Sequence, residues 1–215
     1  MHPNETQRDP PRTAKAARTR AKLVAAARTV FERSGYVDTR LTEITDEANL
    51  SNGSFYTYFD GKEEIFQAVL DDVTEEMLHP DMRDLEADAR PAEVIAAANL
   101  AYLEAYERNA DLMRLLEEVA AINPRIMELR RRRGIAFSSR NARSIRRLQA
   151  RGNVDPELDP IAAAAALSAM VSRMAHIAYV IEAGRWDTGE LAENLTRLWV
   201  NALQIRDEPA SRNGT

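Results

Sequence analysis

The stretch TRLTEITDEANLSNGSFYTYFDGK, residues 39–62, predicts two short helices joined by a tight turn. In the first helix Ile44 and Ala48 place apolar side chains at i and i+4, and Thr39 stands before it as the expected N-cap. Asn49 falls at the turn, where a positive φ is wanted and where Asn is the best tolerated residue after glycine. The stretch therefore predicts two helices held at a sharp angle.

The second helix of this pair, residues 52–59, has unusual chemistry on its outer face. Ser51 precedes it as an N-cap, while Phe55 and Phe59 share an inward face at i and i+4. The side chains left facing outward are those of Asn52, Ser54, Tyr56 and Tyr58. Two phenols, an amide and a hydroxyl on one short helix are typical of a recognition helix in a DNA major groove.

The region from about Arg18 to Val69 resembles the N-terminal domain of the tetracycline-repressor (TetR) family. The resemblance covers about a quarter of the chain and is carried by Ala26, Ala27, Phe31, Gly35, Tyr36, Ile44, Ala48, Ser51, Phe55, Tyr56, Phe59, Lys62, Glu63 and Glu64. Asn49 replaces the family's common turn glycine, Phe55 replaces a Leu or Ile, and Tyr58 stands where His or Tyr is usual. The resemblance implies a DNA-binding dimer, although Tyr58 bears on base preference, so the operator sequence does not follow from it.

The composition limits the classes of protein to which the chain can belong. Its 215 residues are enough to bury a core without a metal or a disulfide. Cysteine is absent, which excludes disulfides and thiol or zinc-thiolate chemistry. Residues 1–12 lack the apolar segment of a signal peptide, and we identify no run long enough to span a bilayer. The prediction is a cytoplasmic protein with no membrane partner.

The charge is distributed unevenly along the chain. The net charge is −5, yet residues 12–40 carry an excess of six positive charges and residues 63–129 an excess of twelve negative charges. Basic residues often decorate a solvated helix face, but such an excess beside two helices of this kind favours phosphate contact.

The remaining patterns predict helices throughout, and hence an all-α fold. After a first helix over 13–34 and the helix-turn-helix, further helices are expected over 60–85, from 91, and over 111–121, 125–151, 161–183 and 188–205. Asp60 and Glu63 are spaced as a capping box for the fourth helix. The predicted domains are a disordered tail (1–12), a three-helix DNA-binding domain (13–60, with the helix-turn-helix at about 40–59), a larger helical ligand-binding and dimerisation domain (61–206) and a second disordered tail (207–215).

The predicted DNA contacts lie on and around the second helix of the helix-turn-helix. Lys62 is a cation at a helix start, where it opposes the helix dipole, and this placement favours a phosphate partner. For Tyr56 and Tyr58 the alternative is that they pack at the surface with their hydroxyls in water. The full set of predicted DNA-binding residues is Thr39, Arg40, Ser51, Asn52, Gly53, Ser54, Tyr56, Tyr58 and Lys62.

The C-terminal helices carry candidates for a ligand pocket and a basic surface. Methionine adapts to varied apolar shapes, which suits a pocket. The candidates to line a ligand pocket are Leu100, Leu103, Tyr106, Met113, Leu116, Met127, Phe137, Met170, Met174 and Tyr179, although each of them taken alone is more often plain core. Residues 130–151 hold nine arginines and no acid. These arginines form either an anion-binding surface or, as we prefer, a face that offsets the acidic segment.

The last two helices have more apolar surface than one subunit is expected to hide. A two-fold four-helix interface is predicted through Ala162, Ala166, Leu191, Leu195, Leu198, Trp199 and Ala202, with burial inside the same subunit as the alternative. Two recognition helices one helical turn apart would then read a palindrome.

These patterns together predict a homodimeric transcriptional regulator that binds a double-stranded operator and responds to a small apolar or amphipathic effector. The alternative is an all-α ligand-binding or enzymatic protein without DNA binding. Catalysis needs a convergent set of groups, whereas His2, His79 and His176 fall in a tail and on separate helices. We therefore expect no catalytic residue, no metal and no cofactor.

Overall fold

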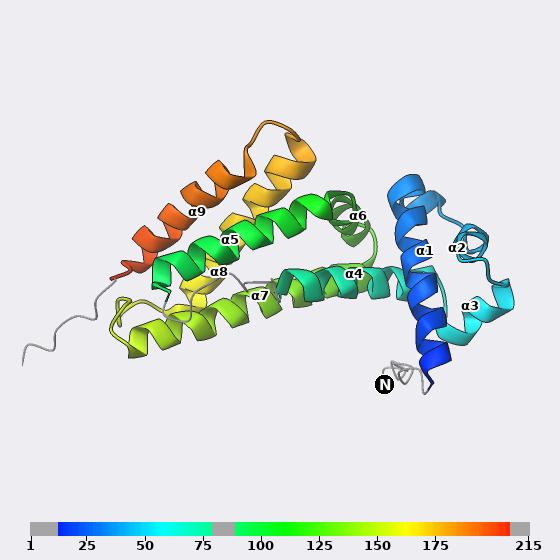
Figure 1. Ribbon diagram of the computed structural model, residues 1–215, viewed down its shortest axis with the longest axis horizontal. Helices are drawn as coiled ribbons and strands as arrows, with labels where there is room; N and C mark the ends of the chain where they lie inside the picture. Colours follow the sequence, from blue (N-terminus) through cyan, green and yellow to red (C-terminus); the bar gives the residue numbers. More distant parts are fainter. Residues whose placement is uncertain (1–12, 79–88, 207–215) are drawn as a thin grey trace, which may run out of the picture. The chain divides into compact units, whose positions relative to one another are not determined.

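The computed structural model describes residues 13–78 and 89–206, and within these ranges every regular element is helical (Figure 1). The predicted all-α class is therefore confirmed. The two expected tails, His79 and the expected end of the fourth helix near Leu85 lie outside the described residues. The chain divides into two compact units, Met1–Val73 and Thr74–Thr215, and the division falls within a helix, α4 (Lys62–Leu78).

The first helix of the N-terminal unit, α1 (Ala14–Asp38), begins where its sequence predicts and is interrupted at Gly35, the predicted stop, before it continues to Asp38. The Thr13 hydroxyl accepts a hydrogen bond from the Ala16 N–H at 3.2 Å, which satisfies one of the free donors of the first turn. Gly35 has φ 76°, a conformation that breaks the helical path. The regular part of α1 therefore stops after Ser34, as predicted.

The core of the N-terminal unit is aromatic. Four phenylalanines form this core, and each is at most 1% exposed. They come from α1, from α3 (Asn52–Tyr58), from the residue that follows α3, and from α4. They are Phe31, Phe55, Phe59 and Phe66. Phe31 and Phe66 meet edge to face with ring centroids 5.1 Å apart, and Ile44 of α2 (Leu41–Glu47) is completely buried beside this core. The two short helices are thus held by side chains that point away from their outer faces.

The predicted N-cap of α2 differs from the structure. The N-cap of α2 is Arg40, whose backbone N–H donates to the Glu43 carboxylate at 2.8 Å, and Thr39 lies one residue further out. At the start of α4 the Asp60 N–H donates to the carboxylate of Glu64.

The C-terminal unit consists of long helices packed in pairs. Its helices are α5 (Pro91–Arg108), α6 (Ala110–Ala120), α7 (Pro124–Ala150), α8 (Pro160–His176), a π-helical turn η1 (Ile177–Ile181) and α9 (Thr188–Leu203). Helix α7 packs along α8, and α5 packs along α9 (Figure 1). The predicted helices match these bounds to within a few residues.

The helix formed by α8 and η1 corrects one expectation. Residues Pro160–Ile181 are long and apolar enough to cross a membrane by length and composition, although no such run was identified from the sequence. Only 28% of the apolar window is buried inside the protein. The apolar face of α8 is therefore largely uncovered within this chain.

Candidate functional site

The outer face of α3 is polar and accessible. Asn52, Gly53 and Thr57 are exposed, and the Tyr56 side chain retains 56% of its accessible surface. Ser54 and Tyr58 are half-buried. Thr57 is absent from the predicted contacts, although its position four residues after Gly53 places it on the same face. The outer face thus offers a phenol, an amide and two hydroxyls to a groove.

The turn between α2 and α3 sets the direction of α3. Asn49 has φ 49°, which confirms the predicted left-handed residue. The Thr45 hydroxyl, buried in α2, donates to Oδ1 of Asn52 at 2.6 Å. Bidentate reading of an adenine requires both the oxygen and the nitrogen of an Asn amide. The contact with Thr45 fixes the orientation of the Asn52 amide, so the first role of Asn52 is to hold the start of α3 against α2.

The predicted cap of α3 is confirmed. The Ser51 hydroxyl oxygen accepts a hydrogen bond from the Ser54 N–H at 3.3 Å, and the two serine hydroxyls lie 3.0 Å apart. The free N–H groups at this end of the helix and the two hydroxyls form a group of donors for an anion.

Thr39 and Arg40 occupy different environments. Thr39 is only 3% exposed, and its hydroxyl donates to the Gly35 carbonyl, which holds the end of α1. Its side chain is therefore committed to the fold. Arg40 is exposed at the start of α2 and is available to a phosphate.

Lys62 forms a clamp inside the N-terminal unit. Its ammonium group donates to the carbonyls of Val37 and Thr39, each at 3.0 Å, and lies 4.8 Å from the centre of the Tyr36 ring. Burial lowers the pKa of Lys62, and the charge of Asp38 acts in the opposite direction. Lys62, which its position in the sequence predicts as a phosphate ligand, thus joins the start of α4 to the end of α1.

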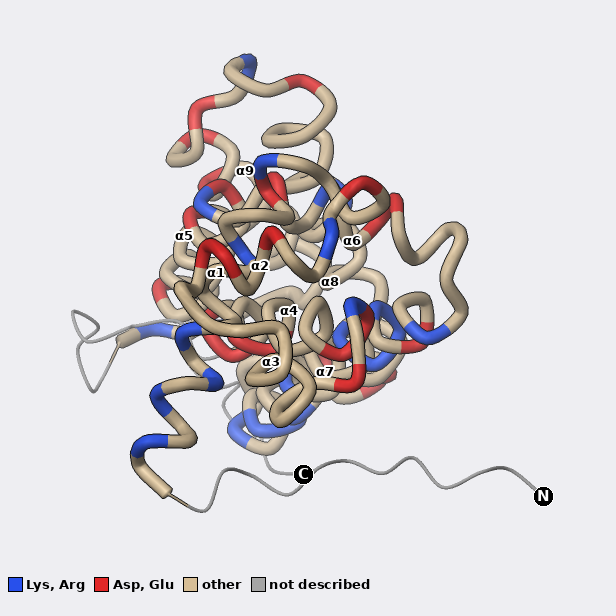
Figure 2. The backbone as a smooth tube through the Cα atoms, turned by 90° about the vertical axis from the view of Figure 1, so that its right-hand side faces the viewer, with Lys and Arg blue, Asp and Glu red and all other residues tan. Residues whose placement is uncertain are grey.

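Basic residues recur along α1, as the blue segments of the tube show (Figure 2). Lys15, Arg18 and Lys22 share one face at i, i+3 and i+7 and are exposed. Among the residues that the structure describes, none of these three has a carboxylate within ion-pair distance, whereas Arg28 pairs with Glu32 at 2.9 Å. The face formed by Lys15, Arg18 and Lys22 is therefore suited to a polyanion.

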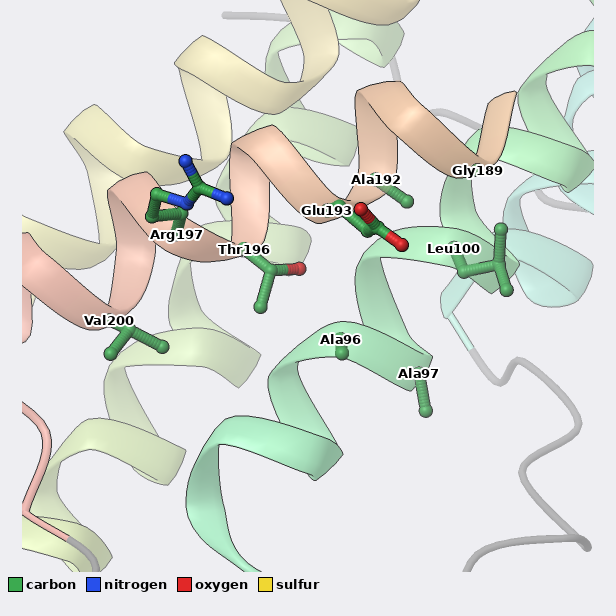
Figure 3. Close-up of a pocket in the computed structure, with 9 residues that line it drawn as sticks. All are labelled: Ala96, Ala97, Leu100, Gly189, Ala192, Glu193, Thr196, Arg197 and Val200. Atoms are coloured by element: carbon green, nitrogen blue, oxygen red, sulfur yellow. The ribbon is translucent and has the colours of Figure 1, made fainter. Parts of the chain in front are cut away.

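The predicted pocket residues are distributed over two concavities, the core and the surface of the C-terminal unit. A concavity of about 510 Å³ lies between α5 and α9, and it includes Leu100 (Figure 3). A second, of about 310 Å³, lies between α8 and α9 and includes Met170 and Met174. Of the other predicted residues, four are core (Leu103, Tyr106, Met113 and Leu116), Met127 is 54% exposed, and Phe137 and Tyr179 are half-buried.

The predicted dimer residues separate into two groups. Leu191, Leu195 and Trp199 are at most 7% exposed and belong to the core of their own subunit, so burial within the subunit is correct for these three. The others lie at the surface: Leu198 is 51% exposed, and Ala162, Ala166 and Ala202 are also exposed. An apolar surface thus remains on α8 and α9.

The arginines of residues 130–151 fall into three groups. Arg133 is buried and Arg140 is half-buried. Arg130 pairs with Glu117 at 2.6 Å, and Arg131 and Arg132 pair with Glu128, so these three offset acidic residues, as predicted. Arg143, Arg146, Arg147 and Arg151 are exposed, and no carboxylate in the described part of the chain pairs with them.

A turn with positive φ, a capped second helix with a polar outer face and an adjacent basic helix define a DNA-binding protein of the helix-turn-helix class. The family described as "Bacterial regulatory proteins, tetR family" matches residues 23–69, and "Tetracyclin repressor-like, C-terminal domain" matches residues 81–206. The chain belongs to the TetR family of transcriptional regulators.

Individual relatives and solved structures agree with this assignment. The A-factor receptor protein of Streptomyces griseus is 28% identical over 84% of this chain and 62% of its own length. The regulator TtgR of Pseudomonas putida is 37% identical over 28% of this chain and 29% of its own length. The regulator YfiR of Bacillus subtilis is 32% identical over 39% of this chain and 38% of its own length. The chain thus spans well under half of these last two relatives.

Two solved structures share the fold. Salmonella enterica GusR superposes with a TM-score of 0.75 at 19% identity, covering 90% of this chain and all of that one. SmeT, the repressor of a Stenotrophomonas maltophilia multidrug efflux pump, superposes with a TM-score of 0.70 at 21% identity, covering 87% of this chain and 91% of the SmeT chain.

Proposed function

We propose that the protein is a cytoplasmic, homodimeric repressor that binds a palindromic operator and releases it when a small apolar or amphipathic effector enters the C-terminal unit. The observation that carries the DNA-binding part is the outer face of α3, where exposed polar groups stand on a helix whose two phenylalanines are each 1% exposed. Such a rigid probe fits a major groove.

The homodimer is supported by the uncovered surface of α8 and α9. An exposed apolar face of this kind is typical of an interface between subunits. Two copies joined there would present two α3 helices to a duplex, and a two-fold axis matches a palindromic site. The effector would act by population shift, because it binds best to the conformation in which the two helices are wrongly spaced.

Selection of bound duplexes from a random pool tests the operator. We expect a two-fold symmetric sequence with half-sites about one helical turn apart. Fluorescence anisotropy with random duplex at low salt distinguishes this proposal from the alternative, an all-α ligand-binding or enzymatic protein without DNA binding. Such a protein gives no salt-dependent signal.

Replacing Gly53 by alanine should separate folding from DNA contact. An added Cβ would lie 4.0 Å from its nearest neighbour, the Ser51 hydroxyl oxygen, so the free protein has room for it. Alanine favours a helix by up to about 1 kcal/mol, and stability should be equal or higher. Operator affinity should fall at least about tenfold, the size of one lost groove contact, because the methyl group blocks close backbone approach.

Gly134→Ala in α7 is the matched control, since no atom lies within 4 Å of its added Cβ. It should raise thermal stability without changing the operator dissociation constant. Unchanged operator affinity of Gly53→Ala in an anisotropy titration would show that α3 does not approach DNA closely.

Replacing Ala166 by arginine should dissociate the dimer. The side chain is exposed on α8, so the folded subunit tolerates the change to within about 0.5 kcal/mol, while a charge at the centre of an apolar interface repels its own copy. Analytical ultracentrifugation should show the dimer dissociation constant raised at least about tenfold. Ile122→Arg, at a position that is 70% exposed outside the proposed interface, serves as the control and should remain dimeric.

A further inference from the structure

The concavity of about 310 Å³ between α8 and α9 is lined in part by the loop that joins η1 to α9 (Figure 1), and we call it the α8–α9 concavity. Its apolar lining consists of two methionines, three leucines and a tryptophan: Met170, Met174, Leu191, Leu195, Leu198 and Trp186. Methionine side chains adapt to ligands of different shape, and a volume of this size is enough for a small organic molecule.

The charges that line the α8–α9 concavity do not cancel. Its polar lining consists of Arg185, Asp187, Glu190 and Asn194. Arg185 already has a counter-ion, because its guanidinium lies 3.0 Å from the carboxylate of Glu182. In the described part of the chain, neither Asp187 nor Glu190 has a Lys or Arg within ion-pair distance. The lining therefore carries an excess of negative charge.

The two carboxylates differ in how far the fold already uses them. Oδ1 of Asp187 accepts a hydrogen bond from the Glu190 N–H at 2.9 Å and so caps the start of α9. The side-chain amide of Asn194 donates to the backbone carbonyl of Glu190 at 2.8 Å, not to its carboxylate. Among the described residues the Glu190 carboxylate thus has no partner, and it is the group that a positively charged ligand would meet.

The tryptophan of this lining is held in place by its neighbours. The Trp186 Nε1–H donates to the carboxylate of Glu182 at 3.0 Å, and the guanidinium of Arg185 lies 5.5 Å from the centre of a Trp186 ring. A tryptophan ring attracts a cation through the negative charge of its face. Trp186 therefore adds to the lining a fixed aromatic surface that favours cations.

We propose that the α8–α9 concavity binds an amphipathic organic cation, whose ammonium group pairs with the Glu190 carboxylate and whose apolar part lies against the methionines, the leucines and Trp186. An anion of the same shape would meet two carboxylates and is disfavoured.

The proposal deepens the proposed function, because it names the class of effector, and it rests on that function for its consequence. Leu198 lines the α8–α9 concavity and also belongs to the exposed surface through which we propose that two subunits join. A ligand that covers Leu198 would therefore alter the interface on which the spacing of the two α3 helices depends.

Isothermal titration calorimetry on the full chain tests the proposal with three probes of one carbon skeleton. They are 3-phenylpropan-1-amine, which is protonated at neutral pH, 3-phenylpropan-1-ol and 3-phenylpropanoate. At low salt the amine should bind about fivefold more tightly than the alcohol, the size expected of one exposed ion pair, and the acid should bind least tightly. The preference for the amine should shrink at 1 M salt, where exposed charges are screened.

Two variants of α9 locate the charge that gives this preference. Glu190→Gln removes the carboxylate with little change of volume, so it should abolish the preference of the amine over the alcohol. Glu193→Gln is the matched control, because it removes the same charge three residues further along α9, where the side chain lines the other concavity. It should retain the preference.

Tryptophan fluorescence shows where the amine binds. Trp186 is 39% exposed and lines the concavity, whereas Trp199, the other tryptophan of the chain, is 7% exposed and does not line it. The amine should change the emission of the wild type, and Trp186→Phe should remove that change. Calorimetric binding without any change of emission would place the amine elsewhere and overturn the proposal.

Equal affinities for amine and alcohol in the wild type, or no binding of any probe, would also overturn it. An unchanged preference in Glu190→Gln would do the same. An emission that changes on dilution of the dimer, with no response to the probes, would show that a second copy of the chain fills the concavity instead.

Release of a selected duplex is measured separately, so that the site and the proposed function can fail independently. Amine binding without release supports the site and refutes effector control. Release by compounds of another class, with no binding of the amine, supports effector control and refutes the cation site.

Discussion

Replacing Phe55 by alanine should lower the free energy of unfolding of the N-terminal unit by about 3–5 kcal/mol, the usual cost of emptying a buried aromatic site. Phe55 is 1% exposed and lies 5.7 Å from the Phe59 ring. The loss is a large share of the stability of a small unit, so α3 should no longer be held in place. Specific DNA binding should disappear with it.

Two probes distinguish the units in a urea titration of Phe55→Ala. Both tryptophans, Trp186 and Trp199, lie in the C-terminal unit, so their fluorescence reports that unit alone, while far-ultraviolet circular dichroism reports all helices. We expect part of the helical signal to be lost at low urea, before the tryptophan signal changes. Thr57→Ala, on the exposed face of the same helix, should leave both transitions in place. A dichroism transition identical to that of the wild type would contradict the role of Phe55.

Replacing Lys15, Arg18 and Lys22 together by glutamine should weaken DNA binding about 100- to 1,000-fold near 0.1 M salt. These exposed side chains share one face of α1 and have no carboxylate partner in the described residues. Each phosphate contact contributes about 0.9 to the slope of log affinity against log salt, so the slope should fall by about 2.7. The sequence selected from a random pool should stay the same, because phosphate contacts position the protein without reading bases.

The matched control changes the same number of charges in the other unit. Arg143, Arg146 and Arg147 of α7 are exposed and also lack a carboxylate partner among the described residues. Their replacement by glutamine alters the net charge by the same amount and should leave the salt slope unchanged. An equal loss of affinity in both triple variants would show that overall charge, or a second DNA surface on α7, determines binding.

Much of the fold follows from local pattern. The stop after Ser34, the positive φ of Asn49 and the cap at Ser51 each depend on a few neighbouring residues. The inward face of α3 follows as well, because Phe55 and Phe59 lie one helical turn apart. Helices α5, α7 and α8 of the C-terminal unit begin with a proline in the same way.

The use of individual side chains was harder to predict. Lys62 resembles a phosphate ligand by spacing, yet its ammonium group binds the carbonyls of Val37 and Thr39, which precede it by more than twenty residues. Thr39 is buried as well, and its hydroxyl donates to the Gly35 carbonyl four residues earlier. Spacing along a helix says nothing about which distant carbonyls lie nearby.

By itself, the sequence determined the helical class, most helix ends and the outward chemistry of α3, because these depend on side chains a few positions apart and on the period of the α-helix. Only the tertiary structure decided which polar groups are bonded inside the protein and which remain accessible to a partner. Arg133 and Arg143 have the same side chain on one helix, but the first is buried beside two methionines and the second is exposed. That difference arises from helices far apart in the chain, whose packing determines where water is excluded.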